Sequence, residues 1–288
     1  ISSIFFFFFW YEEFLSNERQ LDDHYRFPAK ESVAYKNFFF DIPIVDEYLE
    51  LLIQVLNLVG IDCEWNSKQG GFTAFLSHDV DHVQKYNFFN DLVKFLGKEI
   101  IRKKTLKKTP KIIREFYESK KDHKKDPYWT FDFLIDIENK YNFNSIYFFM
   151  TSFKNEVYDC DYSIKSFKIK KLIKKILDNG NYIGIHPNYN SYNDEIKMKE
   201  QVDKFKTISP NGFGGRQHYL RFDIEKPIDM YEKNGLLFDS SLGYPDFAGF
   251  RCGTSHSFKF YSLSQNKPLQ LKEIPLLIME VSLYNQKY

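Results

Sequence analysis

Two carboxylates stand one residue apart at the end of an apolar stretch that has the composition of a buried strand. The stretch runs from Phe72 to His82 as Phe-Thr-Ala-Phe-Leu-Ser-His-Asp-Val-Asp-His. If the strand continues through Val80, the side chains of Asp79 and Asp81 point to one side. One carboxylate could hold a metal ion while the other takes a proton from water. Helix capping and surface ion pairs are the structural alternative.

Histidines supply a second set of potential metal ligands. Five of the seven lie in or beside expected strand-end loops: His78, His82, His186, His218 and His256. The other two, His24 and His123, lie in polar segments, where we expect surface residues. His186 ends the run Tyr-Ile-Gly-Ile-His-Pro, and Pro187 cannot continue a ladder. Because Asp81 ends a strand of the same predicted sheet, a metal role for His186 is favoured over that of a satisfied core residue.

Two glycine-containing segments carry further candidates. In Gly-Gly-Arg-Gln-His-Tyr-Leu-Arg, Arg216 and His218 would share one face of a strand. Arg216 could pair with a carboxylate of the site and keep it ionised, although a structural ion pair is the alternative. The loop at 238–256 contains Asp239 and Arg251, and such loops often carry ligand contacts. A structured surface loop is the alternative there.

Strand-like and helix-like segments alternate along the chain. Strands are predicted within 72–80, 145–150, 182–186, 214–220, 236–238 and 272–283, and helices within 44–59, 83–125, 130–141, 169–177, 193–208 and 228–234. This order predicts an α/β fold whose parallel sheet, open or closed into a barrel, is covered by helices. Polar residues stand at or just after the predicted strand ends: Asp79 and Asp81, Thr151, His186, His218 and Asp239. This is the pattern of a site at the C-terminal face of a barrel.

The first 70 residues differ from the rest and are interpreted as an N-terminal accessory segment. A turn-rich connector at 66–71 marks the boundary, and residues 71–288 form the main domain. The apolar run Phe5–Trp10 is about half the length of a bilayer span and is followed at once by acidic residues, so we expect a buried strand or helix start. Since the chain lacks an initiating Met, we expect it to be a fragment.

Composition limits the partners. The chain has 40 basic and 39 acidic residues, a net charge of +1 that gives no reason to expect a nucleic acid. Lysine-rich stretches at 103–111 and 120–125 could bind an anion, but interspersed acids favour a solvated helix face. Cys63, Cys160 and Cys252 are too few and too far apart for a disulfide framework or a cysteine zinc site. With no signal peptide or membrane span visible, we expect a cytoplasmic or cell-envelope location.

Four motifs together resemble those of a known family. In order they read Ser-His-Asp-Val-Asp, Gly-Ile-His-Pro-Asn-Tyr, Gly-Arg-Gln-His-Tyr and Phe-Asp-Ser-Ser-Leu-Gly. They resemble the polysaccharide deacetylase (NodB-homology, carbohydrate esterase) family, in its His-Asp-Val-Asp branch, over residues 72–283. The resemblance implies a distorted (β/α) barrel with one divalent metal, usually zinc. It also implies a hydrolase that removes N-acetyl groups from amino sugars of a cell-surface polysaccharide or related glycan.

The resemblance also assigns roles. It matches Asp79 with the catalytic base, Asp81 and His186 with metal ligands, and Arg216 with the arginine that tunes the base. Asp239 lies in the segment that corresponds to the family's supporting loop for that arginine. Substrate contacts are expected from three residues of the neighbouring loops: Tyr189, Tyr219 and Arg251.

Two departures from the family pattern leave alternatives open. The family's second metal histidine corresponds to Asn190, so the third ligand is expected to be His218, with Asn190, His82 and His78 as alternatives. No Leu-x-His follows Leu283, so either the fragment ends before that strand or this copy lacks the general acid. A glycan-binding protein on an impaired deacetylase fold, or a hydrolase of non-sugar linear amides, is therefore the competing interpretation.

Overall fold

The structure is a computed structural model that describes residues 12–13, 21–64, 72–153, 158–222, 227–262 and 265–285. The predicted apolar element at Phe5–Trp10 and the connector at 66–71 lie outside the described residues. The chain divides into two compact units: unit 1 comprises residues 1–75 and 184–288, and unit 2 comprises residues 76–183. Each unit is described by itself below.

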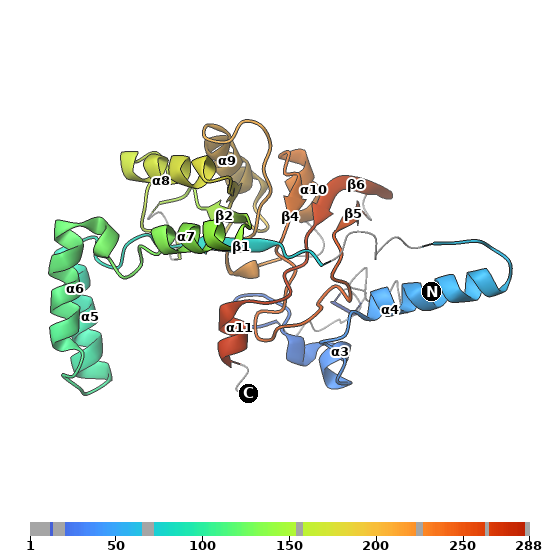
Figure 1. Ribbon diagram of the computed structural model, residues 1–288, viewed down its shortest axis with the longest axis horizontal. Coiled ribbons are helices and arrows are strands. Elements are labelled where there is room, and N and C mark those ends of the chain that lie inside the picture. The colour runs from blue at the N-terminus through green and yellow to red at the C-terminus, as the bar shows by residue number, and fades with distance from the viewer. Residues whose placement is uncertain are drawn as a thin grey trace. The chain divides into compact units, whose positions relative to one another are not determined.

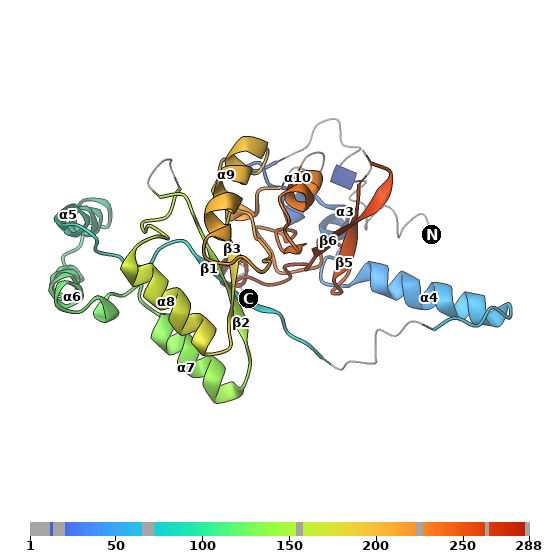
Figure 2. The same ribbon diagram turned by 90° about the horizontal axis from the view of Figure 1, so that it is seen from above.

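Unit 2 contains parallel strands covered by helices (Figures 1 and 2). Its elements are β1 Leu76–Val80, α5 Phe89–Gly97, the π-helical turn η3 Lys98–Arg102, α6 Thr109–Lys121, the 3-10 turn η4 His123–Lys125, α7 Phe131–Tyr141, β2 Ser145–Phe149 and α8 Phe167–Asp178. Strands β1 and β2 are parallel, with Leu76 opposite Ser145 and Val80 opposite Phe149. The sheet order is β1-β2-β3, and the unit boundary falls inside β3 (Tyr182–Ile185).

Local sequence explains these elements. All five residues of β2 are buried, as expected for a continuous apolar strand covered on both faces. Helix α8 is capped at its N-terminus by Ser166, whose hydroxyl accepts a hydrogen bond from the Ile169 N–H, and it buries apolar residues at helical spacing. Thr130 precedes α7 as predicted, but its side chain makes no capping bond.

Helices α5 and α6 lie side by side as a hairpin (Figures 1 and 2). Their contact is a buried apolar cluster formed by Tyr86, Leu92, Ile112 and Phe116. The base of the hairpin is closed by Asp126, whose carboxylate accepts hydrogen bonds from the backbone of Lys85 and Tyr86 at 2.7 and 3.1 Å. The predicted pair of helices within 83–125 is therefore present as one packed hairpin.

Unit 1 combines the N-terminal segment with the C-terminal half. Its elements are η1 Ala29–Glu31, α3 Val33–Lys36, α4 Ile44–Leu58, the end of β3, α9 Glu195–Lys206, η5 His218–Leu220, α10 Pro227–Lys233, β4 Phe238–Asp239, β5 Phe258–Ser262, β6 Lys267–Glu273 and α11 Glu280–Asn285. Strand β6 pairs in parallel with β4 and antiparallel with β5. Gly215 joins this arrangement to β3 through parallel bridges with Ile185 and Asp239.

The N-terminal segment packs on the loop that follows β4. Phe27, Ala29 and Tyr244 form a buried cluster. The Ala29 N–H donates to the Asp246 carboxylate at 2.8 Å, and the Val45 N–H donates to the Gly253 carbonyl at 2.8 Å. These contacts connect residues about 200 positions apart in sequence, whereas the predicted boundary near residue 70 stays a prediction.

Two predicted strands differ from those in the structure. In the segment 214–220 only Gly215 forms bridges, and η5 follows because Tyr219 and Leu220 have φ of 62° and 54°, which no strand accommodates. The last strand, predicted within 272–283, lies earlier in the chain, because β6 spans Lys267–Glu273 and residues 280–285 form helix α11. Strand β6 ends at Glu273, since Pro275 lacks the N–H that a ladder needs. The described strands and helices form a mixed α/β fold, and the barrel stays a prediction.

In the parts of the chain that the structure describes, no helix combines the length and the apolar character that crossing a bilayer requires.

Candidate metal centre

Two buried histidines of unit 1 face each other. His186 Nε2 lies 3.0 Å from His218 Nδ1, and the two rings are nearly perpendicular at 79°. The other nitrogen of His186, Nδ1, donates to the backbone carbonyl of Arg216. Because a carbonyl can only accept, this bond places the proton of a neutral His186 on Nδ1 and leaves the Nε2 lone pair facing His218.

This donor set fits a metal such as zinc. Two nitrogens bound to one tetrahedral zinc at about 2.0–2.1 Å would lie about 3.3–3.4 Å apart, close to the separation of His186 Nε2 and His218 Nδ1. In protein zinc sites the ring nitrogen of a ligand histidine that does not bind the metal usually donates a hydrogen bond to a carbonyl or carboxylate. This bond fixes the orientation of the ring and its tautomer. His186 has that bond.

Neighbouring backbone strands bring these residues to one edge. The Arg216 N–H donates to the Ile185 carbonyl, and Gly215 bridges Ile185 on one side and Asp239 on the other. His186, Arg216 and Asp239 therefore emerge together from neighbouring extended segments. The close approach requires glycine, because a Cβ on Gly214 would lie 2.1 Å from the ring of Phe238.

The alternative third ligands have other partners. The side-chain oxygen of Asn190 accepts a hydrogen bond from Arg221 at 3.4 Å. In unit 2, His78 Nε2 lies 3.2 Å from the Glu138 carboxylate, and His82 Nδ1 lies 3.8 Å from the Asp161 carboxylate. Of the four candidates, His218 is the one whose ring nitrogen faces His186.

The two aspartates predicted from the sequence lie at the end of β1 in unit 2. Val80 is buried and Asp79 is exposed, as the alternation of a strand predicts. Asp81 follows directly after the last strand residue, so its direction depends on the turn rather than on the strand. The roles of Asp79 as a base and of Asp81 as a ligand stay predictions.

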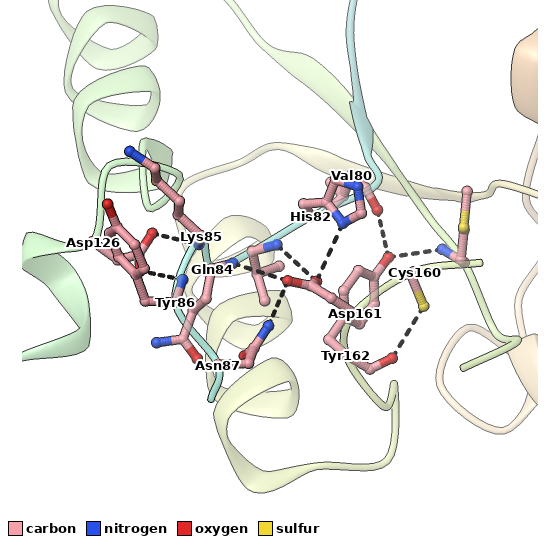
Figure 3. A network of polar contacts seen from close by, with 12 residues as sticks. Val80, His82, Gln84, Lys85, Tyr86, Asn87, Asp126, Cys160, Asp161 and Tyr162 are labelled. Carbon is pink, nitrogen blue, oxygen red and sulfur yellow. Dashed lines mark hydrogen bonds and ion pairs between the residues drawn. The ribbon is translucent and has the colours of Figure 1, made fainter. Parts of the chain in front are cut away.

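Contacts on both sides hold the backbone around Asp81 (Figure 3). The Tyr162 hydroxyl donates to the Val80 carbonyl at 2.6 Å. The Asp161 carboxylate accepts the Val83 N–H at 3.1 Å and lies beside His82, which raises the pKa of that imidazole. Asp81 therefore lies between two anchored neighbours, which restricts where its carboxylate can point.

Arg216 lies among buried polar groups of unit 1. Its guanidinium donates to the Ser240 carbonyl at 2.9 Å and to the Ser240 hydroxyl at 3.0 Å. Asp239 accepts from the Ser241 hydroxyl at 2.7 Å and from the Ser241 N–H at 3.0 Å. Arg216 and Asp239 thus belong to one cluster, whereas tuning of Asp79 by Arg216 stays a prediction.

Glu273 is a buried member of this cluster that the sequence did not single out. It is the direct neighbour of Asp239 across the parallel β4–β6 pair. Burial raises the pKa of Asp239 to about 6, and hydrogen bonds from Ser241 and the charge of Arg216 limit that rise. Burial and the Asp239 charge raise the pKa of Glu273 well above its ordinary value. The alternation of polar and apolar residues in β6 is the only sequence signal for it.

An aromatic cluster of unit 1 adjoins the histidine pair through Tyr219. The Tyr219 ring packs edge-on against His218, with ring centres 4.7 Å apart. His24, which we expected to be a surface residue, instead packs 4.5 Å from the Tyr219 ring, and its Nδ1 lies 2.9 Å from the Tyr189 hydroxyl. Sequence reasoning missed His24 because its contacts come from a segment about 165 residues away. Substrate contact by Tyr189 and Tyr219 stays a prediction.

Arg251 is held in a buried ion pair of unit 1. Its guanidinium is buried and pairs with the Glu13 carboxylate at 2.8 Å, and it also donates to the Gly243 carbonyl. Glu13 is buried as well, so the pair is shielded from water. The predicted role of Arg251 in substrate binding stays a prediction.

Comparisons with known proteins gave one family match, to the N-terminal segment, and a weak similarity to a solved structure. A family of unknown function, DUF7033, matches residues 1–60, and no curated protein matches the chain. Among solved structures, the chain is similar to a Mycobacterium smegmatis protein described provisionally as a polysaccharide deacetylase. The sequence identity is 14%, the TM-score is 0.40, and the match covers 70% of this chain and 57% of that one. The matched part thus spans little more than half of that protein, and at this TM-score the likeness does not decide the fold.

Proposed function

We propose that the chain is a metal-dependent hydrolase that removes N-acetyl groups from amino sugars of a cell-surface polysaccharide or related glycan. The observation that carries this proposal is the pair of facing imidazoles of His186 and His218, one of them fixed by a backbone carbonyl. The proposal includes a deacetylase-type (β/α) barrel. Parallel strands covered by helices support this part of the proposal.

In this proposal Asp81 supplies the third ligand. What supports the assignment is chemistry, because a carboxylate and two imidazoles are all groups that bind zinc. One carboxylate with two imidazoles is a donor set typical of catalytic zinc, which keeps further positions open for water or substrate. When bound, zinc supplies Lewis acidity toward the amide carbonyl and makes water more acidic.

Residues of the chain would carry the proton transfers. Asp79 accepts a proton from the water that attacks the amide carbonyl carbon, after which the carbon–nitrogen bond breaks to give acetate and a free amine. Arg216 and Asp239 support the site from their buried cluster. Tyr189 and Tyr219 contact the sugar beside the histidines. A general acid protonates the leaving amine as the carbon–nitrogen bond breaks.

The test of this function is the variant Asp79→Asn in the full chain. We expect acetate release from an N-acetylated glycan to fall by at least about 100-fold, because the general base is lost while the metal ligands remain. Zinc content measured on the same sample should be unchanged. Asp203→Asn, an exposed substitution of the same type on α9, is the control and should retain full activity. Acetate release by Asp79→Asn at the wild-type rate would show that the base is misassigned.

A glycan-binding protein without catalysis is the second candidate. The observation that favours it is Asn190, which stands where the family has a metal histidine and which bonds Arg221 instead. Zinc analysis after reconstitution separates the two candidates. Bound zinc that is lost in His218→Ala supports the hydrolase, whereas glycan binding without zinc in the unmodified chain supports the binder.

A further inference from the structure

The end of the α5–α6 hairpin concentrates positive charge. We define the hairpin tip as residues 98–111, which comprise η3, the connecting loop and the start of α6. Its seven basic residues are Lys98, Arg102, Lys103, Lys104, Lys107, Lys108 and Lys111, and its one acidic residue is Glu99. Glu99 is buried and lies 3.8 Å from Lys103. Since the whole chain carries only +1, the tip is strongly basic by comparison.

Apolar side chains lie exposed among these cations. Ile101 is 74% exposed and Leu106 is 66% exposed, and Ile100 is exposed as well. None of them belongs to the buried cluster that joins α5 to α6. Single exposed apolar residues are common on protein surfaces and need no explanation. Three of them within one short basic turn form the combination found in segments that bind membrane surfaces.

The tip lies at the free end of the hairpin. The base is fixed by Asp126 and by Lys120, whose ammonium donates to the carbonyls of Tyr86 and Asn87. Helix α6 has 13 residues, so it separates base and tip by about 20 Å. Figure 1 shows the connecting loop at the end of the hairpin away from β1. The tip is therefore presented on a rigid support.

We propose that the hairpin tip binds the surface of an anionic lipid bilayer. Ile101 and Leu106 enter the boundary between head groups and acyl chains, and the surrounding lysines contact lipid phosphates at the ends of their long side chains. Charge alone would equally fit a nucleic acid or an acidic polysaccharide, but such polymers give Ile101 and Leu106 no apolar environment. The proposal is independent of the proposed hydrolase function.

The experiment is co-sedimentation of the full chain with lipid vesicles. We expect binding to vesicles of phosphatidylcholine and phosphatidylglycerol in equal parts, little binding to pure phosphatidylcholine, and weaker binding at high salt. The double variant Ile101→Ser/Leu106→Ser should weaken binding by at least about tenfold, because its apolar contacts are lost. Lys104→Glu/Lys107→Glu should weaken it by a similar factor through charge.

Matched controls separate the tip from general surface properties. Ile196→Ser changes an isoleucine on α9 that is also 74% exposed. Lys170→Glu/Lys171→Glu reverses two exposed lysines on α8. Both controls should bind the anionic vesicles within about twofold of the unmodified chain, and thermal melting should confirm that all variants are folded.

Three results would overturn the proposal. The first is no binding of the unmodified chain to the anionic vesicles. The second is equal loss of binding in the tip variants and their controls. The third is undiminished binding by Ile101→Ser/Leu106→Ser together with equally tight binding of soluble heparin, which would identify a polyanion site instead.

Discussion

At the scale of single residues, the buried carboxyl pair of Asp239 and Glu273 has the clearest electrostatic consequence. The two side chains are neighbours across β4 and β6, and both are excluded from water. Ionising both of two adjacent buried carboxyl groups costs much free energy, because like charges repel and water does not solvate them there. Arg216 provides the positive charge nearby, and the buried Tyr231 is a neutral phenol because burial raises its pKa. The cluster therefore favours one proton held on the Glu273 side.

This pair predicts a dependence of stability on pH. Because the folded-state pKa of Asp239 is raised from 3.8 to about 6, and that of Glu273 is raised well above its ordinary value, the folded state binds more protons than the unfolded state in this range. Their contribution to the free energy of unfolding is thus greatest at low pH and falls as pH rises through about 4 to 6. Glu273→Gln replaces the carboxyl group with a neutral amide of similar shape. This variant should show a weaker decrease of the free energy of unfolding with rising pH.

Urea unfolding of the unmodified chain and of Glu273→Gln at several pH values measures the difference. Other carboxylates contribute slopes of opposite sign, so the test is the difference between the two proteins rather than either curve alone. Glu118→Gln, an exposed substitution on α6, serves as the control. A difference in unfolding free energy that does not change with pH would contradict the assignment of the proton to this pair.

At the scale of elements, helix α9 supports the loop that follows β3. Gln201 of α9 accepts the Asn188 N–H at 2.8 Å and donates to the Asn188 side-chain oxygen at 2.9 Å. Asn188 lies two residues after His186, so the position of α9 affects the backbone around the histidine. The helix is capped at its N-terminus by Asp194, whose carboxylate accepts hydrogen bonds from the N–H groups of Ile196 and Lys197.

Removing this N-cap should therefore destabilise unit 1. We expect Asp194→Ala to lower the free energy of unfolding by about 1 kcal/mol, because two N–H groups lose their acceptor. Asp194→Asn should retain most of the stability, since an amide oxygen also caps. Urea denaturation checks both variants, with Asp203→Ala on the same helix as the control for charge removal. An Asp194→Ala variant as stable as the unmodified chain would contradict the role of the cap.

At the scale of the whole molecule, unit 1 is discontinuous in sequence. Its N-terminal part contributes Glu13, His24 and Ala29 to contacts with residues near 189–251. The buried ion pair of Glu13 and Arg251 is the most deeply shielded of these contacts. A buried charge that loses its partner costs far more than an exposed one, because water cannot replace the partner. The segment matched by the family of unknown function is thus structurally part of unit 1.

Breaking the buried pair should test this organisation. We expect Arg251→Met to lower the free energy of unfolding by about 3–5 kcal/mol, because the Glu13 carboxylate is left buried without its cation. Lys174→Met breaks the exposed Lys174–Asp178 pair on α8 and should cost less than about 1 kcal/mol. Thermal or urea unfolding compares the two. Equal small losses in both variants would indicate that the N-terminal segment contributes little to the stability of unit 1.

Several elements could be predicted from the sequence because their signals are local. A continuous apolar run is enough to predict β2. Apolar residues at helical spacing, followed by a glycine, are enough to predict α4 and α8. The strand at 214–220 could not be predicted correctly, because the φ values of Tyr219 and Leu220 depend on packing against distant residues. The roles of Glu273 and His24 were missed for the same reason: each contacts residues that are remote in sequence.

The sequence by itself determined the alternation of strands and helices and placed His186, Arg216 and Asp239 at strand ends, since these features depend on neighbours within a few residues. Only the tertiary structure decided that His218 faces His186, that Arg251 is held in an ion pair, and that His24 lies beside Tyr219. Such contacts depend on the paths of segments far apart in the chain, which no local pattern specifies.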